Sequence, residues 1–259
     1  MTDGGTSVHR VTAQPDIIVA ENYEDMSRQA AEIVASHIET HPGSAITLPT
    51  GETPRGMYEA LTARIKAGEL DFGKIQFFCL DDYLGKGIHD ETSLTAWLDK
   101  AFLTPAGLDG PNIHFVPTLA EDPAAAARAY EAEIQALGGF TLAVLGLGPN
   151  GHIGFNEPGS PIDSRTRVVE LTDESRTQNA AYYDSGQAIP ERAMTIGIGT
   201  LLEADRIVLI VSGSGKAGIV REALEGPVTS DVPGSYLQTV ADRLTVLLDP
   251  EAASELNRS

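Results

Sequence analysis

Two neighbouring carboxylates, Asp81 and Asp82, directly follow an apolar run that ends at Leu80. Adjacent acids repel one another, which raises the pKa of one of them toward the range of a useful general base. An Asp-Asp pair is also common in solvated turns. The pair therefore favours a catalytic and a structural interpretation about equally.

A second group of polar residues, Asn150, His152 and Glu157, lies in the glycine- and proline-rich segment 145–158. This composition indicates a backbone shaped for close approach. A carboxylate can orient an imidazole and raise its basicity. A lone His is more often a structural residue, but these neighbours at the end of an apolar run favour an acid–base role for His152.

The segment 48–54 could bind an anion through Thr50, Gly51 and Thr53. It leaves a predicted strand and enters a predicted helix, where backbone amides and the helix dipole attract phosphate. The alternative is an ordinary helix start, with Thr53 as the cap and Pro54 at the first helical position. Glu52 fits an anion site only if its carboxylate points away.

Lys216 lies in a fourth segment, Val211-Ser-Gly-Ser-Gly-Lys-Ala217. The motif GxxxxGK[ST] of nucleotide-binding loops requires a glycine where Ile210 stands and a Ser or Thr where Ala217 stands. Nucleoside triphosphate binding is therefore disfavoured. A Gly/Ser turn with a lysine at a helix start still suits a smaller anion, although such a lysine is more often only solvated.

A metal site is the competing interpretation of these side chains. Asp81, His152 and Glu157 would supply three ligands, but the sequence has neither an HExxH motif nor a pair of histidines at ligand spacing. We therefore expect no metal.

Apolar runs of strand length alternate with amphipathic segments along the whole chain. Expected strands cover 16–20, 45–49, 74–80, 113–116, 140–145, 206–211 and 244–248, and expected helices follow Asn22, Thr53, Thr95, Asp122 and Lys216. This pattern predicts an α/β fold with a single doubly wound, mostly parallel sheet and helices on both faces, as in Rossmann-like proteins. Such sheets bind ligands beyond the carboxyl ends of their strands, where the four polar segments lie.

Composition narrows the class of protein. The net charge of −19 disfavours nucleic acid and anionic membranes as partners. No apolar run approaches the ~20 residues that span a bilayer, and the single Cys79 excludes internal disulfides. We expect a cytoplasmic protein with a flexible tail over residues 1–14, one domain over 15–259 and a small-molecule partner; its oligomeric state stays open.

Together, the four segments resemble the sugar-phosphate isomerase/deaminase family represented by glucosamine-6-phosphate deaminase. The resemblance runs from about residue 16 to about residue 250. Its most specific part is GHIGFNEPGS at 151–160, and LPTGETP, LDDYLG, SRTR (Ser164 to Arg167) and GSGKA occur in the same order. The related 6-phosphogluconolactonases typically read GHTASLFP instead of GHIGFNEP, which favours the deaminase branch.

The resemblance implies conversion of glucosamine 6-phosphate to fructose 6-phosphate and ammonia, in amino-sugar catabolism, without a metal or organic cofactor. His152 would open the sugar ring, supported by Asn150 and Glu157. Asp81 would move a proton from C2 to C1. The phosphate would be held by Thr50, Gly51, Thr53 and Lys216.

Three positions depart from the family pattern. Asn150 stands where several relatives carry Asp, so it can orient His152 but cannot ionise. Ala181 stands where relatives often have a phosphate-binding Arg, a role that Arg176 would have to take. Val169 replaces a Lys found in allosterically activated relatives, so we expect no such activation. Galactosamine 6-phosphate remains an alternative substrate; a lactonase or a non-catalytic sugar-phosphate sensor is less favoured.

Overall fold

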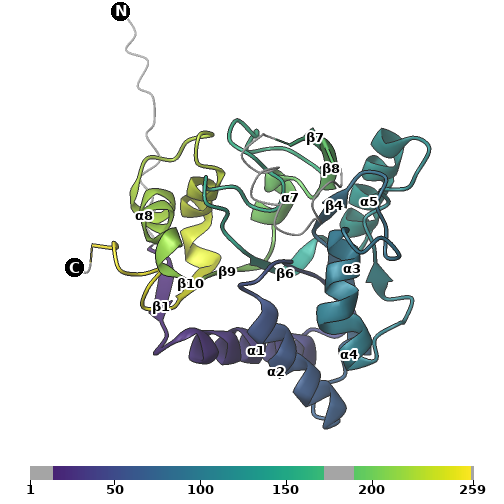
Figure 1. Ribbon diagram of the computed structural model, residues 1–259, viewed down its shortest axis with the longest axis horizontal. Coiled ribbons are helices and arrows are strands. Elements are labelled where there is room, and N and C mark those ends of the chain that lie inside the picture. The colour runs from purple at the N-terminus through teal and green to yellow at the C-terminus, as the bar shows by residue number, and fades with distance from the viewer. Residues whose placement is uncertain (1–13, 172–189, 258–259) are drawn as a thin grey trace, which may run out of the picture.

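The computed structural model describes residues 14–171 and 190–257, and its main feature is a seven-stranded parallel sheet (Figure 1). The strand order is β1-β10-β9-β6-β2-β3-β5, and each neighbouring pair is parallel. The strands are β1 (Asp16–Val19), β2 (Ala45–Leu48), β3 (Gln76–Cys79), β5 (Ile113–His114), β6 (Phe140–Leu145), β9 (Arg206–Val211) and β10 (Leu244–Leu248). The predicted parallel α/β fold is confirmed.

Helices cover both faces of this sheet. Figure 1 shows α1 and α2 side by side on one face and α7 and α8 on the other. The helices are α1 (Tyr23–Thr40), α2 (Arg55–Lys66), α3 (Leu94–Leu98), α4 (Thr104–Ala106), α5 (Pro123–Ala136), α7 (Ile198–Leu202) and α8 (Ala217–Glu225). The other helical segments are the 3₁₀-helical η1 (Phe72–Lys74), η4 (Ser214–Lys216) and η5 (Pro233–Arg243) and the π-helical η2 (Asp99–Leu103).

Strand β3 illustrates why the central strands are apolar without alternation. Successive side chains of a strand point to opposite faces of the sheet. Phe77 and Phe78 are nevertheless both fully buried, because both faces are covered. The ring of Phe77 packs edge-on against that of Phe72, with 5.7 Å between the ring centroids. The ring of Phe78 packs against that of Tyr130 of α5, with 5.4 Å between the centroids. Helices on both faces thus favour consecutive apolar residues in the buried part of the strand, which here follows the partly exposed Gln76.

The predicted helix starts are confirmed at two positions and wrong at a third. Asn22 accepts a hydrogen bond from the amide of Asp25 at 2.8 Å, and Asp122 accepts one from Ala125 at 2.9 Å. Thr53 does not cap α2, which begins at Arg55 without a side-chain cap. The hydroxyl of Thr53 instead accepts a hydrogen bond from Ser212.

A second, smaller sheet was not expected from the sequence. It is antiparallel, in the order β4-β8-β7, and its strands are β4 (Asp81–Tyr83), β8 (Arg192–Thr195) and β7 (Arg167–Glu170). A separate apolar cluster of Tyr83, Phe155, Leu171 and Ala193 packs beside it. The Asp81–Asp82 pair, for which a solvated turn was one interpretation, therefore lies in a strand of another sheet.

The order of the strands fixes where a ligand can bind. After β2 the chain adds β3 and β5 on one side, whereas after β6 it adds β9 and β10 on the other. The connections therefore diverge between the neighbouring strands β2 and β6 and leave a crevice at their carboxyl ends.

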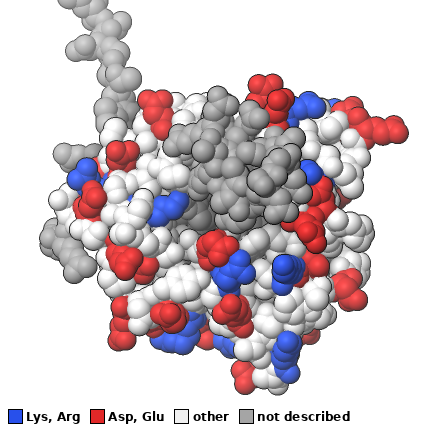
Figure 2. Space-filling view, viewed as in Figure 1, with Lys and Arg blue, Asp and Glu red and all other residues white. Residues whose placement is uncertain are grey.

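Charges on the face shown in Figure 2 are dispersed, with acidic side chains around the rim and basic ones beside several of them. No helix among the described residues is long and apolar enough to cross a membrane. The predicted tail, apart from Gln14, lies outside the described residues, as do Arg176 and Ala181.

Candidate active site

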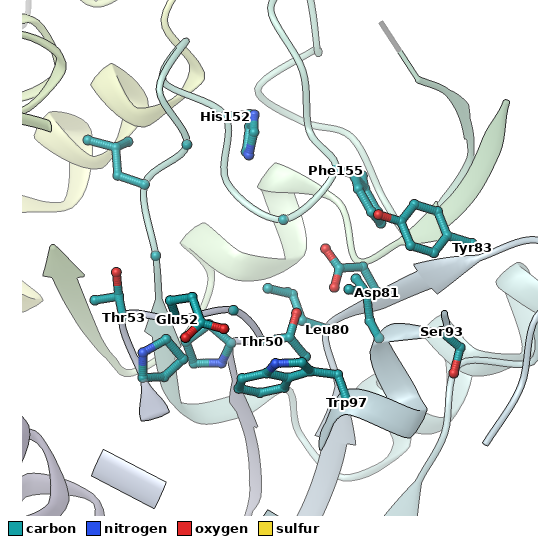
Figure 3. A pocket seen from close by; sticks show the side chains of 18 of the residues that line it. Thr50, Glu52, Thr53, Leu80, Asp81, Tyr83, Ser93, Trp97, His152 and Phe155 are labelled. Carbon is teal, nitrogen blue, oxygen red and sulfur yellow. The ribbon is translucent and has the colours of Figure 1, made fainter. Parts of the chain in front are cut away.

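The crevice between β2 and β6 opens into a cavity of about 420 Å³ (Figure 3). Its walls come from the segments that follow β2, β3 and β6, together with the start of α3. The predicted site residues that line it are Thr50, Gly51, Thr53, Asp81, His152 and Lys216. Asn150 and Glu157 are not in the lining and contact His152 from behind.

Asp81 faces the cavity from the first position of β4 and is only 5% exposed. Burial raises its pKa to about 8, the neighbouring charge of Asp82 adds to the shift, and the backbone amide of Phe155 opposes it. Its Oδ1 atom has no hydrogen-bond partner among the described residues. A buried carboxylate with a pKa near neutrality and a free oxygen suits proton transfer.

Asp82 has a different environment, although it is adjacent in sequence. Its carboxylate accepts hydrogen bonds from the backbone amides of Tyr83, Leu94 and Thr95 at 2.7, 2.9 and 3.0 Å. Two of these amides belong to the first turn of α3, so Asp82 holds this helix against β4. The structure therefore separates the pair into one anchoring carboxylate and one that faces the cavity.

His152 lies on the opposite wall of the cavity from Trp97 (Figure 3). Its imidazole packs directly on the backbone of Gly148, where an added Cβ would lie 2.2 Å from Nε2. Gly154 is similarly constrained, because its φ is +56° and a Cβ there would lie 3.1 Å from Oδ2 of Asp81. The expectation that glycines in this segment permit close approach is confirmed.

Asn150 links His152 to Glu157 through its two amide atoms. Its Oδ1 accepts a hydrogen bond from the backbone amide of His152 at 3.2 Å, and its Nδ2 donates to Oε2 of Glu157 at 3.0 Å. The same Oε2 lies 3.7 Å from Nδ1 of His152. Asn150 thus orients the backbone of His152 and the buried carboxylate behind it, and it does not bond to the imidazole ring.

Donors suited to an anion gather at the other end of the cavity. Lys216 donates a hydrogen bond from Nζ to the carbonyl of Leu147 at 2.8 Å, and burial lowers its pKa to about 8. The hydroxyls of Thr53 and Ser212 lie 3.3 Å apart and join the segments after β2 and β9. Gly51, with a φ of +106°, allows the turn that brings Thr50 and Thr53 to the same cavity.

Several lining residues gave no chemical signal in the sequence. Tyr83 and Phe155 form one wall, with ring centroids 5.1 Å apart. Trp97, the only tryptophan of the chain, lines the cavity from α3. Its position in a predicted helix indicated only packing, because nothing in the local pattern showed that Asp82 holds this helix at the cavity.

The SRTR segment is tied to the segment that carries His152. Arg167 donates hydrogen bonds to Oδ1 of Asn156 at 2.7 Å and to Ser160 at 3.1 Å. Asn156 in turn donates to the carbonyls of Ile153 and Ile196.

Within residues 14–171 and 190–257, no three His, Cys, Asp or Glu side chains are grouped as metal ligands.

Comparison with known proteins shows the same fold and sequence pattern in one family. The family model described as glucosamine-6-phosphate isomerases/6-phosphogluconolactonase matches residues 19–246. The chain is 39% identical to the glucosamine-6-phosphate deaminase of Thermoanaerobacter pseudethanolicus over 238 residues, which cover 92% of this chain and 94% of the relative. It is 40% identical to that of Rhodopirellula baltica over 255 residues, covering 98% and 99% of the two chains.

Solved structures give the same result. A monomeric glucosamine-6-phosphate deaminase superposes with a TM-score of 0.88 at 37% identity, covering 93% of this chain and all of that chain. The 6-phosphogluconolactonase of Leishmania guyanensis superposes with a TM-score of 0.73 at 21% identity, covering 94% and 99%, and supports the fold alone. The chain therefore belongs to the family of glucosamine-6-phosphate isomerases and 6-phosphogluconolactonases.

Proposed function

We propose that this protein is a glucosamine-6-phosphate deaminase, which converts glucosamine 6-phosphate and water to fructose 6-phosphate and ammonia. The observation that carries the proposal is one cavity lined by the buried carboxylate of Asp81, by His152 and by Lys216. The similarity to deaminases at about 40% identity supports the same reaction. The buried Cys79 thiol suits the reducing cytoplasm, where we place the enzyme in amino-sugar breakdown.

The phosphate of the substrate would bind at the end of the cavity formed by Thr50, Gly51, Thr53 and Lys216. Amides and hydroxyls beside the start of α2, together with the ammonium group, supply local positive potential on a chain whose net charge is −19. A bound phosphate would also raise the pKa of Lys216, which burial alone lowers to about 8. Binding and protonation of this lysine are therefore coupled.

Ring opening comes next. It requires a proton on the ring oxygen while the C1 hydroxyl loses one, and a positioned imidazole can perform both transfers. Two contacts support His152 for this step: Gly148 leaves room for its ring, and Asn150 accepts a hydrogen bond from its backbone amide. Glu157, 3.7 Å from Nδ1, stabilises the imidazole when it carries a proton.

Asp81 would then remove the proton from C2 and deliver it to C1. As the C2–H bond breaks, its electrons form a C1=C2 double bond, and the aldehyde oxygen on C1 takes up the proton that the amino group loses. The nitrogen lone pair then forms the C=N bond while C1 takes the proton from Asp81, which leaves a protonated imine at C2. Water adds to this imine, and the C–N bond breaks to release ammonia and the ketone. Asp81 must be ionised to begin the transfer, and the ammonium of a bound amino sugar would favour that form.

An assay of three substrates tests this function. Glucosamine 6-phosphate, galactosamine 6-phosphate and 6-phosphogluconolactone are incubated with the enzyme, and ammonia and lactone hydrolysis are followed separately. We expect ammonia from glucosamine 6-phosphate. Faster ammonia release from galactosamine 6-phosphate would identify the galacto epimer as the preferred substrate. Lactone hydrolysis without ammonia from either amino sugar would show that the protein is a lactonase and not a deaminase.

A further inference from the structure

The segment assigned to phosphate contains a carboxylate that should oppose an anion. Glu52 stands between Gly51 and Thr53 and lines the cavity (Figure 3). Hydrogen bonding from Arg55 lowers its pKa, and hydrogen bonding from Trp97 adds to this effect, so Glu52 is ionised near neutral pH. Two like charges a few ångströms apart repel even in a solvated environment.

Arg55, the first residue of α2, is positioned to cancel this charge. Its Nε and Nη2 atoms donate to the two carboxylate oxygens of Glu52 at 3.0 and 2.8 Å. This is the bidentate geometry in which a guanidinium binds a carboxylate most strongly. Arg55 itself does not line the cavity, so its donors face Glu52.

Trp97 holds the guanidinium from a second side. The Cζ atom of Arg55 lies 5.3 Å from the centroid of the indole ring, within the range of a cation–π contact. Trp97 lines the cavity beside Glu52. The three side chains form a cluster, here called the 52–55–97 cluster, along the wall next to the phosphate segment.

We propose that Arg55 is a positioning residue for phosphate binding, which acts through Glu52 rather than by contacting the ligand. It neutralises the carboxylate and keeps it bound to the guanidinium, so that the donors of residues 50–53 can accept a phosphate. The inference rests on the proposed function only in placing the phosphate group in this segment. It holds for any sugar phosphate or for inorganic phosphate.

The single tryptophan provides a direct readout of binding. Trp97 is the only tryptophan in the chain and lines the cavity, so its fluorescence can be titrated with inorganic phosphate without any turnover. The variants are Arg55→Ala, Glu52→Gln, the double variant and Arg55→Lys. Arg64→Ala is the matched control, because Arg64 lies on the same helix but pairs with Glu32 and does not line the cavity. Calorimetry checks the midpoints, and thermal unfolding checks that each variant folds.

We expect Arg55→Ala to weaken phosphate binding about three- to tenfold at low ionic strength, the size expected for one uncompensated, solvated charge. Glu52→Gln should bind phosphate at least as tightly as the wild type, because it leaves the cation of Arg55 uncompensated, whereas Arg64→Ala should stay close to the wild type. The double variant should recover wild-type affinity, since the repelling charge is gone. Arg55→Lys should keep part of the wild-type affinity, because lysine retains the positive charge but cannot form the two parallel hydrogen bonds of a guanidinium. The loss in Arg55→Ala should shrink in about 0.5 M salt.

Two results would overturn the proposal. A double variant as weak as Arg55→Ala would mean that Arg55 contacts the phosphate itself, and wild-type affinity in Arg55→Ala would mean that Glu52 needs no neutralisation. The same titration separates this inference from the proposed function. Recovery in the double variant without ammonia release by the wild type would refute only the deaminase reaction.

Discussion

The seven-stranded parallel sheet supplies the cavity with segments that follow its strands, whereas the small antiparallel sheet supplies Asp81 from within a strand. The segments after β2 and β9 present hydroxyls, amides and Lys216, all suited to a charge that the ligand already carries. The strand β4 instead presents a buried carboxylate whose pKa is raised to about 8.

Under the proposed function, this difference would separate phosphate binding from proton transfer. Donors on segments beside a helix start need only complement a phosphate, so their loss should raise KM more than it lowers kcat. A general base must be held in a fixed, dry position, and a strand paired on its neighbour provides that position: Asp81 pairs with Thr195. Changes on the β4 side should therefore lower kcat.

The largest effect is expected from Asp81→Asn. The amide cannot accept the C2 proton, and positioned general bases contribute ~10²–10⁴ in rate. Turnover should fall by at least that factor, while the affinity for substrate stays within a few-fold of the wild type. Deuterium from the solvent should no longer be incorporated at C1. Near-wild-type turnover would remove Asp81 from this role and with it the contrast between the two sheets.

Stability gives a control for the same variant. The folded-state pKa of Asp81, about 8, lies above the ordinary pKa of an aspartate side chain, about 3.8, so folding favours the protonated carboxyl. The wild type therefore loses stability as pH rises from about 4 to about 8. Asp81→Asn removes this loss, and its melting temperature should equal or exceed that of the wild type at pH 8. A much lower value would attribute the lost activity to misfolding.

His152→Gln should have the next largest effect, confined to ring opening. Glutamine can form hydrogen bonds but cannot exchange a proton, which removes a contribution of about 10²-fold or more. A substrate locked in the open form should be comparatively spared. Steady-state rates with closed and open substrates measure the difference, and equal losses on both would assign His152 to another step.

Lys216→Met tests the binding side of the comparison. A hydrogen bond to a charged group contributes roughly 1.5–3 kcal/mol, so KM should rise about 10- to 100-fold while kcat changes little. Because Lys216 also donates to Leu147, thermal unfolding is measured in parallel. A fall in kcat comparable to that of Asp81→Asn would contradict the separation of binding from chemistry.

A smaller effect is expected from Asp82→Asn. Asp81 must be ionised, so kcat/KM should rise with pH through about 8 in the wild type. The charge of Asp82 raises this pKa, and its removal should move the rise to lower pH. Asparagine keeps one acceptor oxygen for the start of α3 but puts an N–H group among amide donors, so unfolding is checked as well. An unchanged pH profile would show that burial alone sets the pKa of Asp81.

The smallest expected effect is that of N-acetylglucosamine 6-phosphate, which should not raise the rate. Val169 lies on β7 opposite Ala193 and packs against the apolar cluster beside the small sheet. Arg167 already donates to Asn156 and Ser160. Activation needs a coupling free energy of ~1–3 kcal/mol between the effector site and the active site. An apolar Val169 and an Arg167 that is already hydrogen-bonded offer an effector few contacts that could supply it. Velocity should be hyperbolic in glucosamine 6-phosphate; a sigmoidal curve that the acetylated sugar makes hyperbolic would contradict this.

The sequence predicted the parallel sheet because its central strands are buried on both faces and so are mainly apolar. It also predicted the polar segments after β2, β3 and β6, since the ends of such strands face the same edge. Residues such as Thr50, His152 and Lys216 were found for this reason. Their individual roles follow from the family resemblance and await the experiments above.

Only the tertiary structure decided how Asp81 and Asp82 differ and why Trp97 lines the cavity with Arg55 behind it. The small sheet pairs β4 with β8, which lies about 110 residues later in the sequence, and three short strands give no periodic signal of their own. Burial and hydrogen bonding then assign one carboxylate to the helix and leave the other facing the cavity. A local sequence pattern reports which residues are buried, whereas the environment of a side chain depends on contacts made across the fold.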